Sequence, residues 1–429
     1  MRHPRGGGGR SLLRATVVLA SLAVLLATGL SARADVAVET LGRVETLSGE
    51  PRSHWVWVAD LLLRRSALLD LDRGTFLGMV STGYLSPAAV FPRERNEFYV
   101  PETYYSRGSR GTRTDTVTVY DATSLAPSGE VVIPPKRAIN VLPSANSALS
   151  DDDRFLAVFN MTPATSLSIV DVERRRFVQE IATPGCSLVY AAGRRRFLML
   201  CGDGSYLTVN LDEDGRHANT LRHEAFFDPQ TDPVTEKAVR HGDTWLFVSF
   251  EGFVHPVDVS GDAPRTEEVW SLLDDEDRRA SWRIGGSQHL AVHEASHRLF
   301  SLMHRGGADT HKEPGTELWV YDLETQTRVQ RIQLRHPGFS YLGETLDFGQ
   351  SWIWPFNRLS GWLLDHVAPN PGLSQIQVTQ DDEPLLITAS LFSGSLAVYD
   401  ARTGEFLRRL SSGNFTAHLI QAPWGRAPR

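Results

Sequence analysis

Three short stretches decide the fold: Ser168-Ile-Val-Asp171, Leu318-Trp-Val-Tyr-Asp322 and Leu396-Ala-Val-Tyr-Asp400. Each stretch is a run of mostly apolar residues that ends in Asp. Two of them lead through a polar turn, 325–328 or 402–405, into another strand, Val329–Leu334 or Phe406–Leu410. Short apolar runs bounded by turn residues are typical of β-strands rather than helices. The stretches therefore predict one strand-turn-strand unit that is used more than once.

The unit recurs along most of the chain. We count seven copies, whose closing residues are Asp70, Asp121, Asp171, Asp212, Asp258, Asp322 and Asp400. The copies centre on Trp55–Val80, Glu97–Ile133, Phe155–Ile181, Phe197–Leu221, Trp245–Trp270, Leu299–Leu334 and Leu385–Leu410. Repeats of about 40–50 residues with three or four strands each are typical of β-propellers, in which neighbouring blades bury each other's faces. We therefore predict an all-β, seven-bladed β-propeller, with six or eight blades as alternatives.

The first 34 residues have the pattern of an export signal. Four arginines precede an apolar run over 15–30, and Ala32-Arg33-Ala34 is a cleavage motif. We predict a secretory signal peptide at 1–34, with an uncleaved anchor as the alternative. The full chain carries a net charge of −7. The signal holds five Arg and no acidic residue, so the mature chain carries −12. An acidic protein of this kind is not expected to bind nucleic acid or anionic membranes.

The predicted propeller occupies 35–429 and contains one long excursion. Residues 336–375, before the last unit, hold Trp352, Trp354, Trp362, Phe339, Tyr341, Phe348 and Phe356. Such an insertion is either a contact surface or a loop packed on its own blade. The best helix candidate is Ser271–Ala280, with Ser271 as its N-terminal cap.

The two cysteines lie on either side of a predicted hairpin turn. With Gly193-Arg194 at the tip, Tyr190 faces Phe197, Leu188 faces Met199, and Cys186 faces Cys201. Opposed residues of antiparallel strands are close enough for a disulfide, and an exported protein permits one. We predict a Cys186–Cys201 disulfide, with two buried thiols as the alternative.

Three motifs suggest chemistry, and each has a simpler interpretation. His293-Glu-Ala-Ser-His297 matches the zinc-protease pattern H-E-x-x-H, which requires a helix. Strand-like residues flank it here, so we predict a hairpin turn and no metal site. Arg107–Arg113 (RGSRGTR) is basic and glycine-rich, and anion binding through its backbone N–H groups is one alternative. It lacks the Gly-Lys-Ser/Thr of a P-loop, so we interpret it as an inter-strand loop or a contact with an acidic partner. His304–Lys312 is interpreted as a loop at the propeller rim. From the residues alone, we find no catalytic residue and no metal or cofactor site.

Several longer stretches have a pattern beyond the repeat: Thr103–Gly111, Arg113–Asp115, Ile133–Ala138, Pro163–Ser166, Ile169–Asp171, Gly185-Cys186, Cys201–Gly204, Trp270–Leu273, Asp275–Asp277, Thr310–Lys312 and Trp319-Val320. Together they resemble the heavy subunit of the quinoprotein amine dehydrogenases, and aromatic (aralkyl) amine dehydrogenase more than methylamine dehydrogenase. The resemblance covers nearly all of the mature chain.

The resemblance implies a seven-bladed propeller in a periplasmic enzyme of amine metabolism and electron transport. In such enzymes the light subunit carries tryptophan tryptophylquinone and the catalytic base. A primary amine is oxidised to an aldehyde and ammonia, and electrons pass to a blue copper protein. The resemblance also implies a heterotetramer of two heavy and two light chains. This chain would scaffold the light subunit and hold no cofactor itself.

One residue is carried over from the family's substrate channel. An aromatic residue of the heavy chain lines that channel after a Thr/Gly-Gly step, and the matching stretch here is Thr82-Gly-Tyr-Leu85. The resemblance thus places Tyr84 in the substrate channel, where Tyr replaces the family's Phe. A rim tyrosine with no such role is the alternative. For the whole chain, the alternative function is a free-standing periplasmic propeller that binds a ligand or a protein.

Overall fold

The computed structural model describes residues 47, 52–85, 88–139, 144–336, 340–341, 344–345, 370–391, 393–412, 414 and 416–424. All of them belong to one compact unit, Thr46–Arg429. The predicted signal peptide, 1–34, lies outside the described residues, as does most of the 336–375 insertion with its three tryptophans. Of the insertion, the structure describes its two ends, 336 and 370–375, and a short hairpin formed by β25 (Ser340–Tyr341) and β26 (Glu344–Thr345).

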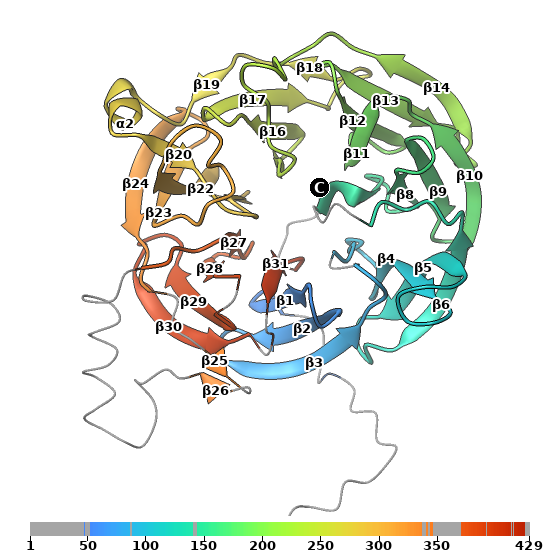
Figure 1. The fold of residues 1–429 in the computed structure, drawn as a ribbon, viewed down its shortest axis with the longest axis horizontal. Helices are drawn as coiled ribbons and strands as arrows, with labels where there is room; N and C mark the ends of the chain where they lie inside the picture. The colour runs from blue at the N-terminus through green and yellow to red at the C-terminus, as the bar shows by residue number, and fades with distance from the viewer. Residues whose placement is uncertain are drawn as a thin grey trace, which may run out of the picture. The chain divides into compact units, whose positions relative to one another are not determined.

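Seven antiparallel sheets stand in a ring around a central axis, which confirms the predicted seven-bladed propeller (Figure 1). The strands of the first four blades, in chain order, are β1 (Trp55–Asp60), β2 (Arg65–Asp70) and β3 (Thr75–Ser81); β4 (Glu97–Tyr105), β5 (Arg113–Asp121) and β6 (Pro127–Ile133); β7 (Ser147–Leu149), β8 (Phe155–Asn160), β9 (Ser166–Asp171) and β10 (Arg176–Ala182); and β11 (Cys186–Ala191), β12 (Arg196–Cys201), β13 (Tyr206–Leu211) and β14 (His217–Arg222).

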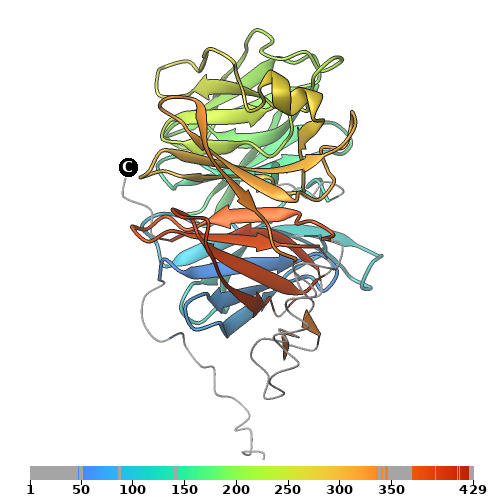
Figure 2. The same ribbon diagram turned by 90° about the vertical axis from the view of Figure 1, so that its left-hand side faces the viewer.

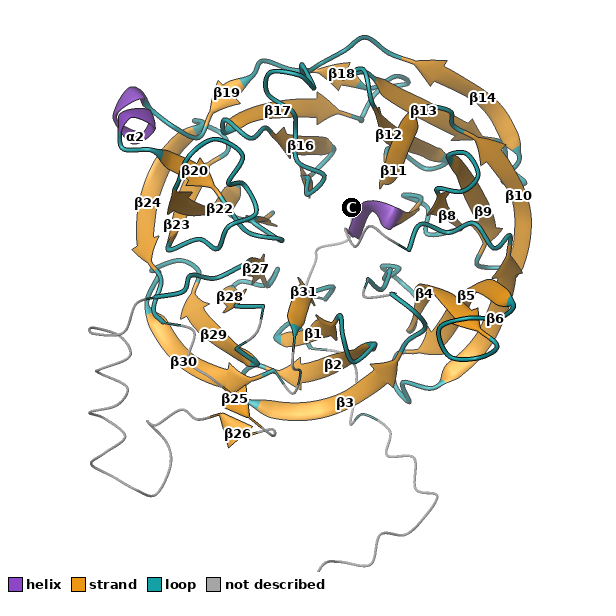
Figure 3. Cartoon of the chain, viewed as in Figure 1, coloured by secondary structure: helices purple, strands orange, loops and turns teal. Residues whose placement is uncertain are grey.

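The strands of the last three blades are β15 (Val239–His241), β16 (Thr244–Val248), β17 (Phe253–Asp258), β18 (Arg265–Thr266) and β19 (Trp270–Ser271); β20 (Trp282–Ile284), β21 (Leu290–His293), β22 (Arg298–Arg305), β23 (Glu317–Asp322) and β24 (Thr327–Gln333); and β27 (Gln375–Val378), β28 (Leu385–Ala389), β29 (Ser395–Asp400) and β30 (Phe406–Ser411). A last strand, β31 (Ala417–Gln421), returns to the first blade and pairs with β1. Helices are few among the described residues, as Figure 3 shows: η1 (Ser144–Asn146) and α2 (Asp275–Arg279).

The core lies between the blades. In the third blade the central strands β8 and β9 are buried at every position, whereas the outermost strand β10 is exposed at several. A central strand has a neighbouring blade on each face, so its residues need not alternate between apolar and polar. The central strands are therefore mostly apolar, and for this reason the apolar runs in the sequence correctly predicted the positions of the blades.

Each blade closes its outer turn with the same interaction. Strands are counted outward from the ring axis: β31 is the first strand of the first blade, the bridge at Val90 takes that place in the second, and β20 and β21 share it in the sixth. The Asp at the end of the third strand accepts hydrogen bonds from backbone N–H groups of the turn that follows, an arrangement that favours Asp at the start of a turn. The donors are Asp72 and Arg73 for Asp70, Thr123 and Ser124 for Asp121, Arg174 for Asp171, Asp214 and Arg216 for Asp212, Ser260 for Asp258, Glu324 and Thr325 for Asp322, and Arg402 and Thr403 for Asp400.

The two faces of the ring differ because antiparallel strands alternate in direction. One face, here called the turn face, carries the Asp turns and the turns between the first and second strands of each blade. The other, here called the loop face, carries the connections between blades and those between second and third strands, such as 82–89, 106–112, 134–146, 272–281 and 306–316. The cyan hairpin of β4 and β5 projects from this face, to the right in Figure 2. The insertion at 336–375 also starts and ends on it.

Cys186 and Cys201 form a disulfide and oppose each other on β11 and β12. The register nearer the turn was predicted wrongly. Tyr190 pairs with Leu198 rather than Phe197, because a bulge lies between Ser187 and Tyr190. At this bulge Leu188 has a φ of 63°, a left-handed conformation that a pattern of alternating residues does not reveal.

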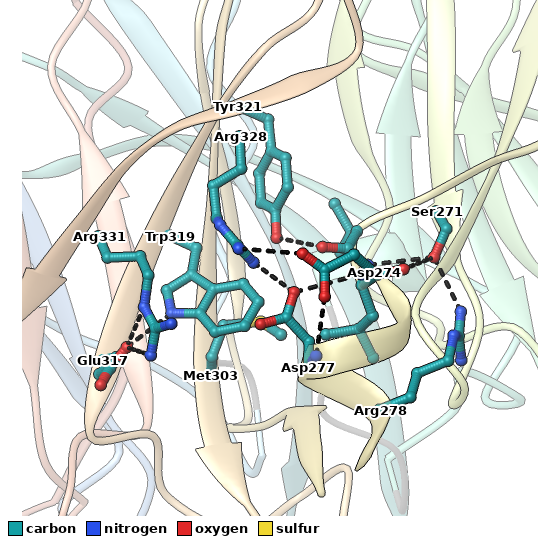
Figure 4. Close-up of polar contacts among 12 residues, drawn as sticks. Ser271, Asp274, Asp277, Arg278, Met303, Glu317, Trp319, Tyr321, Arg328 and Arg331 are labelled. Carbon is teal, nitrogen blue, oxygen red and sulfur yellow. Dashed lines mark hydrogen bonds and ion pairs between the residues drawn. The ribbon is translucent and has the colours of Figure 1, made fainter. Parts of the chain in front are cut away.

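The helix predicted over Ser271–Ala280 is present but shorter, as α2 over Asp275–Arg279, so both its start and its cap were predicted wrongly. Helix α2 is capped by Asp274, whose carboxylate accepts from the N–H of Asp277 at 2.8 Å. Ser271 instead ends β19, and its hydroxyl accepts a hydrogen bond from Arg278 at 2.8 Å (Figure 4). Arg328 of the sixth blade donates to Asp277 at 2.5 Å. The stretch 270–277 therefore fastens the connection between the fifth and sixth blades.

The Asp turns predict acid sensitivity. The N–H of Thr325 and the guanidinium of Arg298 hold the pKa of Asp322 at about 2, against a usual 3.8. A lowered pKa in the folded state stabilises the fold above the unfolded value, and the stabilisation is lost as the pH falls from about 4 toward 2. We expect Asp322→Asn to lower the melting temperature at pH 6 and to flatten its fall between pH 4 and 2.

Circular dichroism melts over this pH range provide the measurement. Asp382→Asn, an exposed residue in a first-to-second-strand turn of the same face, is the control and should behave like the parent. Parallel curves for Asp322→Asn and the parent would contradict the proposed contribution of the charged carboxylate.

Candidate functional site

Tyr84 lies on the loop face, in the connection that leads from the first blade to the second. Its backbone N–H donates to the carbonyl of Thr103 at 2.7 Å. Its half-buried ring meets the ring of Tyr105 edge to face at 5.8 Å, and the guanidinium of Arg64 lies over it at 4.5 Å. Aromatic and cation–π contacts of this kind hold a ring in one orientation.

A buried carboxylate lies beneath this connection. Glu102 is fully buried, and it accepts hydrogen bonds from the N–H of Gly83 at 2.7 Å and the hydroxyl of Tyr104 at 2.8 Å. Burial raises the pKa of Glu102, and these hydrogen bonds act in the opposite direction. The carboxylate thereby joins β4 to the backbone next to Tyr84.

A buried arginine holds the same connection from the other side. Arg137 comes from the connection between the second and third blades and is 4% exposed. Its guanidinium donates to the carbonyl of Tyr84 at 2.9 Å, to the carbonyl of Leu85 at 3.3 Å, and to the hydroxyl of Thr103 at 3.1 Å. Burial is the main cause that lowers the pKa of Arg137 to about 10, so the group remains charged at neutral pH.

A second buried carboxylate completes this network. Asp115 is fully buried and accepts from the hydroxyl of Thr103 at 2.9 Å, from the guanidinium of Arg113 at 2.7 Å, and from the backbone N–H of Arg137 at 2.8 Å. Two stretches that carried the family resemblance, 103–115 and 133–138, therefore meet around Tyr84. Their spacing in the sequence gave no sign of this meeting.

The Arg107–Arg113 motif forms the tip of the β4–β5 hairpin. Part of its backbone is bonded within the hairpin: Ser106 N–H donates to Thr112 O, and Arg107 N–H to Arg110 O. The N–H groups of Ser106, Arg107 and Thr112 are thus not free to bind an anion, in agreement with the interpretation as an inter-strand loop. The side chains of Arg107 and Arg110 are exposed, so the tip presents positive charge to solvent.

The H-E-x-x-H motif is a hairpin turn between β21 and β22, as predicted. Its two histidines have different partners. His293 bonds Ser296 Oγ at 2.7 Å and the carbonyl of Asp381 at 3.0 Å, whereas His297 bonds His241 at 3.0 Å. Within the part of the chain that the structure describes, no three His, Cys, Asp or Glu side chains gather closely enough to bind a metal.

The His304–Lys312 loop joins β22 to β23 on the loop face. His304 bonds Thr310 Oγ1 at 2.9 Å, and the ring of His311 stacks on Phe250. Burial lowers the pKa of both histidines, so both rings are neutral at pH 7. These contacts give the loop a packing role between the fifth and sixth blades.

The stretches that carried the family resemblance gather on one face. Most lie in or beside loop-face connections: 103–111, 133–138, 163–166, 185–186, 201–204, 270–277 and 310–312. By contrast, 169–171 and 319–320 lie within third strands. The loop face is therefore the candidate surface for function, with Tyr84 and its buried supports at one sector of it.

The family model and the related proteins that match this chain all point to the same family. The sequence model of the methylamine dehydrogenase heavy chain family matches residues 61–340. The chain is 24% identical over 412 residues to the methylamine dehydrogenase heavy chain of Methylorubrum extorquens, with 91% of each chain covered. It is 27% identical over 367 residues to that of Paracoccus versutus, covering 83% of this chain and 76% of the relative. The expected closer likeness to aromatic amine dehydrogenase has no support in these relatives and stays a prediction.

A solved structure shares the fold. A functionally unknown protein from Desulfotomaculum acetoxidans superposes with a TM-score of 0.53 and 11% identity, covering 86% of this chain and 98% of that one. At this identity the likeness concerns the fold alone.

Gly83 provides a test of the packing beside Tyr84. A Cβ at this position would lie 2.8 Å from the carbonyl oxygen of Thr103 and 3.0 Å from Glu102 Cβ. We expect Gly83→Ala to destabilise the protein by about 1–3 kcal/mol, because backbone must move. Gly307→Ala, in a loop of the same face with open space around the site, is the control. Equal unfolding midpoints for the two variants in denaturant would contradict the tight packing.

Proposed function

This chain belongs to the methylamine dehydrogenase heavy chain family, and on that premise we propose that it is the heavy subunit of an amine dehydrogenase. The assembled enzyme would oxidise primary amines to an aldehyde and ammonia. The observation that carries this proposal is the family match over 280 residues, from the first blade through the sixth. The matching relatives are methylamine dehydrogenase heavy chains, and a preference for aromatic amines stays a prediction.

The chemistry of the reaction would come from the partner. We propose that a light subunit carries tryptophan tryptophylquinone, which would accept two electrons from the amine and pass them to a blue copper protein. This chain would contribute binding surface and channel wall, and no catalytic residue of its own. Family membership also supports an assembly of two heavy and two light chains.

The packing of the tryptophans supports this division of labour. Trp282 and Trp319 have ring centroids only 5.1 Å apart, but both are buried, and Trp319 is fully so. The guanidinium of Arg331 lies 4.6 Å from the ring of Trp319 and 4.9 Å from that of Trp282. The indole N–H of Trp319 is bonded to Glu317 (Figure 4). An amine substrate could not reach this pair, so the residues fit a structural role rather than a cofactor.

We place the light subunit on the loop face. That face carries most of the stretches that resemble the family, the projecting β4–β5 hairpin and the start of the long insertion. Tyr84 lies on the same face, so a subunit docked there would close a channel against its ring. Export to the periplasm by residues 1–34 completes the proposal, and the Cys186–Cys201 disulfide is in keeping with an oxidising compartment.

The decisive experiment is purification of the native protein from the periplasm, followed by an SDS gel and an absorption spectrum. We expect a smaller chain to co-purify and a quinone absorbance to bleach on addition of a primary amine. A colourless single chain that does not respond to amines would contradict the proposal and favour a free-standing binding propeller.

The docking face has its own prediction. Arg107 and Arg110 are exposed at the hairpin tip, so the double variant Arg107→Glu/Arg110→Glu would repel an acidic partner surface. We expect its dissociation constant for the small chain of the native complex to rise about tenfold in 50 mM NaCl. The difference should shrink in 500 mM NaCl because salt screens exposed charges.

The matched control is Arg73→Glu/Arg194→Glu, which places the same charge change on exposed residues of the turn face. Analytical ultracentrifugation at the two salt concentrations measures both variants. Equal weakening by the two double variants would show a general charge effect and would contradict docking at the loop face.

A further inference from the structure

The backbone around Tyr84 is bonded at nearly every step. The N–H of Thr82 donates to the carbonyl of Arg64 at 2.8 Å, that of Gly83 to Glu102 at 2.7 Å, and that of Tyr84 to Thr103 at 2.7 Å. These acceptors belong to the first and second blades. A surface connection usually leaves such groups to water, so this one is held unusually firmly.

The carbonyl groups of the same segment are bonded by the guanidinium of Arg137. Arg137 donates to the carbonyls of both Tyr84 and Leu85, and a planar guanidinium fixes direction as well as distance. Leu85 has a φ of 48°, in the left-handed region that residues other than glycine rarely adopt. Strained residues of this kind persist only where surrounding contacts hold them. The bond from Arg137 to the carbonyl of Leu85 is such a contact.

We propose that Arg137 and Glu102 are positioning residues that set where the ring of Tyr84 stands, and thereby which amines the assembled enzyme accepts. The inference rests on the proposed function, in which Tyr84 lines the substrate channel. Glu102 fixes the N–H of Gly83 immediately before Tyr84, and Arg137 fixes the carbonyl of Tyr84 itself. The ring is then a fixed wall of the channel, supported on its sides by Arg64 and Tyr105.

Because the side chains of Glu102 and Arg137 are buried, they can hold the backbone of Tyr84 in one position. Both side chains are at most 4% exposed, so neither can turn out to solvent without opening the junction of the first three blades. Replacing Arg137 removes its hydrogen bonds to two carbonyls at once, and one of them belongs to the strained Leu85. The expected result is a shift of the Tyr84 ring rather than a loss of the propeller, because the blade strands themselves keep their ladder hydrogen bonds.

A double-mutant cycle tests the proposal in the assembled heavy–light enzyme. The measured quantity is the ratio of kcat/KM for benzylamine to that for methylamine. We expect Tyr84→Ala to change this ratio, and Arg137→Gln to change it at least about fivefold. In the Tyr84→Ala background, Arg137→Gln should add less than about a twofold change, because a residue that acts through Tyr84 has nothing left to position.

The matched control is Arg113→Gln. Arg113 belongs to the same network through Asp115, but its guanidinium donates to Asp115 and to the carbonyl of Arg137 rather than to the Tyr84 segment. We expect its ratio to stay within about twofold of the parent. Glu102→Gln should change the ratio in the same direction as Arg137→Gln. If Arg137→Gln does not assemble with the light subunit, Arg137→Lys replaces it under the same criteria. Lys keeps the positive charge but lacks the paired N–H donors of the guanidinium.

The outcomes distinguish the channel role of Tyr84 from the positioning role of Arg137. A ratio unchanged by Tyr84→Ala would overturn the channel role of Tyr84 within the proposed function. A ratio changed by Tyr84→Ala, together with an Arg137→Gln effect that is absent or equally large in both backgrounds, would overturn only the positioning role. An equal fall in kcat/KM for both amines in Arg137→Gln would likewise mark Arg137 as a structural residue.

Discussion

The whole ring depends on the pairing of β31 with β1, in which Trp57 near the start of the propeller lies opposite Gln421 near the end of the chain. Propeller blades bury their faces only against neighbours, so the first and last blades stay incomplete until the ring closes. The closure is reinforced by side chains. Asp60 accepts from the N–H of Thr416 at 2.9 Å and from its hydroxyl at 2.8 Å. The amide of Gln288, from the sixth blade, bonds both the N–H and the carbonyl of Ile420.

The same closure supports the candidate site. Gln421, the last residue of β31, accepts from the N–H of Ala89 at 3.1 Å and donates to its carbonyl at 2.8 Å. Ala89 belongs to the connection that carries Tyr84. One end of this connection therefore depends on the C-terminal strand, while the other is held by Glu102 and Arg137. The position of Tyr84 is set by the first blade, the second blade and the connection to the third, together with the chain's last strand.

The buried charges of this region serve placement more than stability. Burying Arg137 and Asp115 costs desolvation free energy, and their attraction to each other and to the partly exposed Arg113 offsets it only when the geometry is good. What such a network provides is a defined arrangement, because each polar group has particular partners that it would lose in any other packing. The arginines of the sixth blade work in a similar way. Arg328 and Arg331 cover Trp319, and Arg328 reaches on to the helix α2 at the edge of the loop face (Figure 4).

The sequence by itself determined the seven blades, because apolar central strands and the Asp turns are local features that recur with each blade. It also located the Cys186–Cys201 pair and the turn at 293–297, where alternation and strand flanks were informative. The capping of α2 by Asp274 is local, a capping box within 274–277 that the sequence contained and the prediction missed. Only the tertiary structure decided the register bulge at Leu188 and the closing strand β31. It also decided that 103–115 and 133–138 meet around Tyr84. These features arise from contacts between residues distant in the chain or from single backbone conformations, and neither leaves a periodic trace in the sequence.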